Sequence, residues 1–62
     1  MDFRELIGSG EVVLENVHYY LVKFTVYEEA KFAYRSLTLA GFNTSAITGS
    51  VHEYYIYIWK EV

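Results

Sequence analysis

Residues 18–42 contain, without a break, the signals for a strand, a helix start and a helix stop. Residues 18–24 are rich in the aromatic and β-branched side chains typical of strands. Thr25 and Glu28 have the Thr-x-x-Glu spacing of a capping box, which predicts that a helix begins there. Gly41 followed by Phe42 predicts that this helix ends on a left-handed residue with an apolar contact behind it. A strand followed directly by a helix limits the chain to folds with mixed layers.

The predicted helix has one apolar stripe rich in alanine. Taken at 100° per residue, five positions fall on this stripe, flanked by Tyr27 and Tyr34. Small side chains allow a helix to lie close to a sheet. The stripe consists of Val26, Ala30, Ala33, Leu37 and Ala40.

The C-terminal part of the chain predicts a β-hairpin. Residues 44–48 are expected to form a short strand and residues 51–59 the last strand, because polarity alternates strictly over residues 54–59. Gly49-Ser50 suits a type II′ turn, which would pair Ile47 with His52. One face would then carry Ile47, Tyr54, Ile56 and Ile58, and the other Ala46, Tyr55, Tyr57 and Trp59.

The N-terminal part predicts a second hairpin. Residues 11–14 read as a strand, and Glu15-Asn16 as its turn because Asn tolerates positive φ. A single long strand with a bulge at the same dipeptide is the alternative. In the hairpin, Val12 and Leu14 would share a face with Val17, Tyr19 and Leu21, and the opposite face would carry Val13, Tyr20, Val22 and Phe24.

The first ten residues are expected to form a short turn and a hinge. Asp2 can cap one helical turn, with Phe3, Leu6 and Ile7 on a shared face. Gly8-Ser9-Gly10 lacks the Lys-Ser/Thr that follows a phosphate-binding loop, so we interpret it as a hinge.

These elements predict a single α+β domain over residues 1–62, in the order hairpin, helix, hairpin (ββαββ). One helix would pack on one face of a four-stranded, mostly antiparallel sheet. The aliphatic face, with Val22, Phe24, Ile47, Ile56 and Ile58, is expected to receive the helix. Only the N-terminal turn could cover the reverse face. The candidate binding residues on that face are Tyr19, Leu21, Tyr55, Tyr57 and Trp59.

Composition points to association with another chain and excludes several classes of protein. The chain has 62 residues, of which 53% are hydrophobic. It contains no cysteine that could form a disulfide and no proline that could rigidify a loop. The net charge of −3 and the scattered cations argue against a nucleic-acid partner. No apolar run approaches the ~20 residues of a membrane span. The start of the chain lacks the basic segment of a signal peptide, so we expect a cytoplasmic location.

Catalytic and metal-binding chemistry is not expected. His18 and His52 are predicted to lie within strands, and neither has a second His or a Cys at ligand spacing. Glu28 and Glu29 suit the N-terminal end of the helix better than acid–base catalysis. A chain this small should not enclose a pocket of about 300 Å³ or more. We therefore predict no catalytic residue, no metal, no cofactor and no enzymatic activity.

Residues 19–24 with Ala30, Ala33 and Leu37 resemble the third strand and second helix of an RNA-recognition motif. His18 stands where that family has glycine, and Leu21 where it has a stacking aromatic residue. The Tyr-Tyr strand, Glu-Glu-Ala helix and Ala-Gly-Phe stop also resemble half of a septal-peptidoglycan-binding SPOR domain. We interpret both resemblances as convergence on a βαβ half.

The predicted function is a non-enzymatic protein-binding module. We expect a homodimer formed through the tyrosines and Trp59 of the reverse face, called the aromatic face below. This homodimer would bind or inhibit a larger protein, as phage- or plasmid-encoded inhibitors of this size do. A second candidate patch lies on the outer side of the helix and consists of Phe32, Leu39 and Arg35. The alternative is a module that binds single-stranded nucleic acid by stacking bases on the aromatic face.

Overall fold

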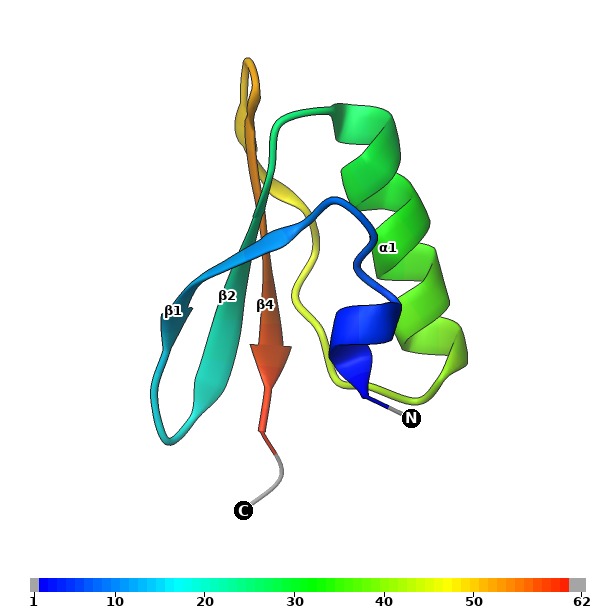
Figure 1. Ribbon diagram of the computed structural model, residues 1–62, viewed down its shortest axis with the longest axis vertical. Helices are drawn as coiled ribbons and strands as arrows, with labels where there is room; N and C mark the ends of the chain where they lie inside the picture. Colours follow the sequence, from blue (N-terminus) through cyan, green and yellow to red (C-terminus); the bar gives the residue numbers. More distant parts are fainter. Residues whose placement is uncertain (1, 61–62) are drawn as a thin grey trace.

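The computed structural model describes residues 2–60 and has the predicted ββαββ order (Figure 1). Its sheet has four strands in the order β1-β2-β4-β3, and all neighbouring pairs are antiparallel. The predicted α+β fold is confirmed. The elements are the 3₁₀ turn η1 (Phe3–Glu5), β1 (Glu11–Glu15), β2 (Tyr19–Phe24), α1 (Tyr27–Leu39), β3 (Thr48–Ser50) and β4 (Glu53–Trp59).

One face of the sheet is covered by both α1 and the N-terminal turn, which lie side by side in Figure 1. Phe3 belongs to the core, and its ring centroid lies 4.3 Å from that of Tyr20. Asp2 caps this turn as predicted, because its side chain accepts a hydrogen bond from the Arg4 N–H. The buried core consists of Phe3, Ile7, Val22, Phe24, Ala30, Ala33, Leu37, Ile56 and Ile58.

The start of α1 differs from the prediction. Val26 is the N-cap residue, with φ −120° and ψ 126°, and no side chain caps the helix. The predicted capping box is therefore wrong, because Thr25 lies one position before the N-cap, outside the site from which a hydroxyl caps the first turn. The alanine stripe is buried only in its middle, at Ala30, Ala33 and Leu37, while Val26 and Ala40 at the caps are exposed.

The end of α1 confirms the predicted glycine stop. Gly41 has φ 92°, and its N–H donates to the carbonyl of Thr38. The N–H of Phe42 donates to the carbonyl of Leu37, which completes a Schellman motif. Phe42 then packs against the core, as its position in the sequence predicted.

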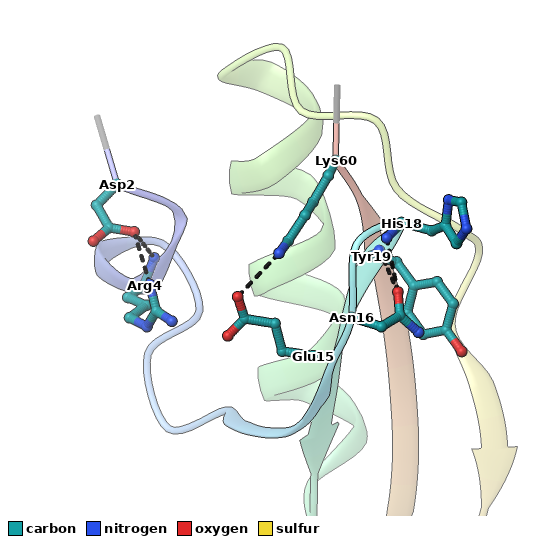
Figure 2. A network of polar contacts seen from close by, with 7 residues as sticks. All are labelled: Asp2, Arg4, Glu15, Asn16, His18, Tyr19 and Lys60. Carbon is teal, nitrogen blue, oxygen red and sulfur yellow. Dashed lines mark hydrogen bonds and ion pairs between the residues drawn. The ribbon is translucent and has the colours of Figure 1, made fainter. Parts of the chain in front are cut away.

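The first hairpin is confirmed, but the predicted Glu15-Asn16 turn is one residue too early, because Glu15 belongs to β1 and pairs with Tyr20 and the turn covers residues 16–18. The Asn16 side-chain oxygen accepts hydrogen bonds from the N–H groups of His18, at 2.8 Å, and Tyr19, at 3.0 Å (Figure 2). Asn16 therefore folds the turn as a hydrogen-bond acceptor and does not need positive φ.

A bulge changes the faces of β1. The pairing register shifts between Val12 and Leu14, so that Val12 pairs with Val22 and Leu14 with Leu21. The prediction placed Val12 on the reverse face and Val13 on the helix side. It was wrong for Val12, which packs against the core on the helix side, because the extra residue between Val12 and Leu14 reverses the alternation of faces. Val13 has no partner in this register and is 44% exposed. Leu14 lies on the reverse face, as predicted.

The second hairpin turns two residues later than predicted. Its turn is Val51-His52, with φ of 44° and 66°, and Ser50 pairs with Glu53. The predicted Gly49-Ser50 turn and the Ile47–His52 pair are therefore wrong. Gly49 lies inside β3 with φ 103°, where an added Cβ would overlap the backbone carbonyl of Glu53. Its glycine signal thus marks a close backbone approach instead of a turn.

The predicted strand over residues 44–48 is mostly irregular. Thr44 forms an isolated bridge with Ile58, and only Thr48 of this segment belongs to β3. The Ser45 hydroxyl accepts a hydrogen bond from the N–H of Tyr57, and the N–H of Ser45 donates to the carbonyl of the same residue, both at 2.9 Å. This loop runs alongside β4, and Ile47 packs against the core as expected.

Candidate interaction surfaces

The reverse face of the sheet carries a cluster of aromatic side chains. Tyr19 pairs directly with Trp59, and Leu21 with Tyr57, across the antiparallel β2–β4 ladder. Side chains directly opposite each other point to the same face. Because Ile56 and Ile58 are buried against α1, the alternating Tyr55, Tyr57 and Trp59 project to the other side.

The rings of this cluster are in contact with one another. The Tyr19 ring meets those of Tyr57 and Trp59 edge to face, with centroids 5.1 and 5.3 Å apart. Tyr57 and Trp59 stack at 5.8 Å with an interplanar angle of 11°. Trp59 keeps 40% of its surface exposed, and its neighbours are half-buried. We call Leu14, Tyr19, Leu21, Tyr55, Tyr57 and Trp59 the aromatic face.

No part of the chain within residues 2–60 covers the aromatic face. Figure 1 shows α1 and η1 together on the opposite side of the sheet. The N-terminal turn, which alone could have covered the aromatic face, contributes Phe3 and Ile7 to the core on the helix side instead. The structure thus brings the predicted residues Tyr19, Leu21, Tyr55, Tyr57 and Trp59 together on one surface; their role in binding stays a prediction.

The cations of the described chain lie mostly away from the aromatic face. Lys23, at the edge of this face, pairs with Glu53 at 3.8 Å. Lys60 pairs with Glu15 at 3.0 Å, and its Nζ lies 4.5 Å from the centroid of Tyr20, on the helix side (Figure 2). Arg4 belongs to the N-terminal turn, and the remaining two cations, Lys31 and Arg35, belong to α1. A phosphate backbone crossing the aromatic face would find one cation, which is already paired.

The predicted helix patch is divided by the structure. Phe32 and Arg35 line one shallow hollow of about 210 Å³ together with Glu28 and Lys31. Phe32 is 73% exposed and Leu39 is 82% exposed, but Leu39 lines none of the hollows described. The residues Phe32, Leu39 and Arg35 therefore do not form one continuous pocket.

A larger groove, which the sequence did not reveal, lies between the N-terminal turn and α1. Its volume is about 540 Å³, and its walls include Leu6, Ile7, Phe32 and Ala33. This volume is larger than the roughly 300 Å³ that we predicted as the upper limit for a pocket in so small a chain. The groove can be this large because it is partly open to solvent and is not an enclosed cavity. The apolar signal of the N-terminal turn was present in the sequence, but its position against α1 was not.

Both histidines lie in turns, which corrects the prediction that they lie within strands. His18 precedes β2 and His52 precedes β4, and both are exposed. Because Tyr19 pairs with the last residue of β4, the two histidines sit at opposite ends of the sheet. They cannot act together as ligands of one ion.

Comparisons with protein-family models, with curated proteins and with solved structures found no match to this chain. Within residues 2–60, no helix has both the length and the apolar character needed to cross a membrane.

Proposed function

We propose that the chain is a non-enzymatic protein-binding module that associates with a second copy of itself through the aromatic face. The observation that carries the proposal is the cluster of Tyr19, Tyr57 and Trp59, which lies in mutual contact on the side of the sheet away from α1. Tyrosine and tryptophan are enriched in interfaces and in their energetic hot spots. Packing two such faces would give each small domain a second apolar core.

The polar groups of the aromatic face are available for hydrogen bonds across an interface. Among the hydrogen bonds of residues 2–60, none involves the hydroxyl groups of Tyr19, Tyr55 or Tyr57. Buried tyrosine hydroxyls usually find a partner, so these groups are available to bond across an interface. The pair Lys23–Glu53 at the edge offers further polar contacts.

The sheet edges are less suited to self-association than the face. β1 is interrupted by its bulge and begins and ends with Glu11 and Glu15. β3 has three residues. Bulges, charges and short edge strands all disfavour pairing between sheet edges. We therefore favour packing of sheet on sheet over joining of edges into one larger sheet.

The test compares two lysine substitutions that add the same charge on opposite sides of the domain. Trp59→Lys would place an ammonium group in the aromatic face, whereas Leu39→Lys changes a side chain that is 82% exposed on α1. The melting temperature of a dimer rises with protein concentration. We expect this dependence for the wild type and for Leu39→Lys, and its loss for Trp59→Lys. A concentration-independent melting temperature for all three proteins would contradict the proposal.

The same protein reports on nucleic acid, because Trp59 is the one tryptophan of the chain. Base stacking would quench its fluorescence, and phosphate contacts would make the binding weaken with salt. We expect no quenching by single-stranded oligonucleotides at low salt. Salt-sensitive quenching would favour the nucleic-acid alternative over self-association.

A further inference from the structure

We infer that the groove between the N-terminal turn and α1 is a second binding site, and that it takes a short peptide segment with an apolar side chain next to Lys or Arg. This inference rests on the protein-binding part of the proposed function but not on dimerisation. The groove lies on the helix side of the sheet, because its lining residues Ile7 and Ala33 belong to the core there, so a partner could occupy it while the aromatic face is engaged elsewhere.

The walls of the groove are apolar. Leu6 and Ile7 come from the N-terminal turn, and Phe32 and Ala33 come from the facing turn of α1. Ile7 and Ala33 are buried in the core and form a fixed floor, while the Phe32 ring is 73% exposed. An aromatic ring at the rim of an apolar groove can close over an inserted apolar side chain. The volume of about 540 Å³ is ample for one large side chain and its neighbours.

The rim of the groove is acidic. Glu5 stands on one wall and Glu28 and Glu29 on the other, and no Lys or Arg is among the residues that line it. Glu28 pairs with Lys31 at 3.7 Å. Glu5 and Glu29 take part in no ion pair within residues 2–60. Two uncompensated carboxylates beside an apolar groove complement a cationic, partly apolar segment and repel phosphate groups.

The charges also argue that the occupant is a different protein instead of a second copy. Arg4, Lys23, Lys31 and Lys60 are already paired with carboxylates of their own chain. Arg35 is the remaining cation of the five in the sequence. With a net charge of −3, a second copy would bring mainly repulsive charge to this rim.

The experiment selects displayed random dodecapeptides on the intact wild-type protein. We expect the enriched peptides to combine a large apolar residue with a neighbouring Lys or Arg. A synthetic enriched peptide should shift the amide NMR signals of Ser9, Ala33 and Ser36, which line the groove, and leave those of Tyr57 and Trp59 unchanged. The absence of enriched peptides, enrichment of acidic ones, or shifts confined to the aromatic face would each overturn the inference.

Matched variants then separate charge from apolar contact. Glu29→Gln should weaken peptide binding about twofold, while Glu11→Gln removes the same charge outside the groove, also from a carboxylate in no ion pair within residues 2–60, and should leave binding unchanged. Phe32→Ala should weaken binding about tenfold and Leu39→Ala should not. Equal effects within either pair would contradict the assignment.

The dimer and the groove can fail separately. Binding of the peptide by Trp59→Lys, the variant expected to be monomeric, would support the groove whatever the state of association. A wild-type dimer that gives no enriched peptide would overturn the groove and leave the proposed self-association standing.

Discussion

Tyr19 contacts Trp59 edge to face across the two central strands, with ring centroids 5.3 Å apart and planes inclined by 79°. The two residues are direct partners in the β2–β4 ladder, and the alternation of β4 places them on the side of the sheet that the helix does not cover. The same ladder buries Ile58 opposite Tyr20, against the helix. One pair of strands therefore supports both the core and the candidate interface.

The turn between β1 and β2 should depend on the side-chain oxygen of Asn16. Asn16→Ala removes the acceptor of two backbone N–H groups and should lower the free energy of unfolding by about 1 kcal/mol. Asn16→Asp keeps an acceptor and should remain within about 0.5 kcal/mol of the wild type. Urea unfolding at one fixed protein concentration measures both. If Asp destabilises as much as Ala, the amide oxygen does not hold the turn.

The turn between β3 and β4 should become more stable when Val51 and His52 are replaced by residues that tolerate positive φ. Val51 and His52 have positive φ, which costs an L-residue roughly 1–2 kcal/mol. Val51→Asn with His52→Gly gives the preferred sequence of a type I′ turn and should raise the free energy of unfolding by about 1–2 kcal/mol.

The chain supplies its own control for this prediction, because Val17-His18 is the same dipeptide in the other hairpin. No positive φ occurs at Val17 or His18. Val17→Asn with His18→Gly should therefore give no gain in the free energy of unfolding. A gain from both substitutions, or from neither, would contradict the strain at Val51-His52.

Two glycines with similar φ should differ in their tolerance of alanine. Gly41, with φ 92°, has open space where a Cβ would lie, so Gly41→Ala should cost only the backbone strain of about 1–2 kcal/mol. Gly49, with φ 103°, faces the Glu53 carbonyl, so Gly49→Ala adds overlap and should cost about 3 kcal/mol or more. Equal losses in urea unfolding would show that β3 does not approach β4 as described.

Two leucines on α1 should differ sharply. Leu37 is fully buried at 0% exposure, and Leu37→Ala should lower the free energy of unfolding by about 2–5 kcal/mol. Leu39→Ala, on the opposite side of the helix, should change it by less than about 0.5 kcal/mol. Chemical denaturation distinguishes them, and a large loss for Leu39→Ala would show that this side chain is covered in solution.

The sequence predicted the elements whose signals are local and repeated. The alternation over residues 54–59 placed Ile56 and Ile58 inside and Tyr57 outside, and the structure agrees. The Gly41-Phe42 stop is likewise determined by its immediate neighbours. The aromatic-face residues on β2 and β4 could be predicted for the same reason, since two strands of known alternation define a face.

The sequence could not predict features that depend on contacts between distant segments. The register shift between Val12 and Leu14 is a relationship between strands, and nothing in either strand alone marks it. Gly49 looked like a turn residue because its close approach to Glu53 is visible only once β3 and β4 are paired. The groove beside Phe32 depends on where the N-terminal turn packs. The sequence of a short apolar segment does not by itself determine which part of the fold it packs against.

Sedimentation equilibrium of the wild-type protein tests the central proposal most directly. We expect a mass twice the 7.3 kDa of one chain, which falls to the single-chain mass for Trp59→Lys but not for Leu39→Lys. A single species of 7.3 kDa for the wild type, over about a hundredfold range of concentration, would contradict self-association through the aromatic face.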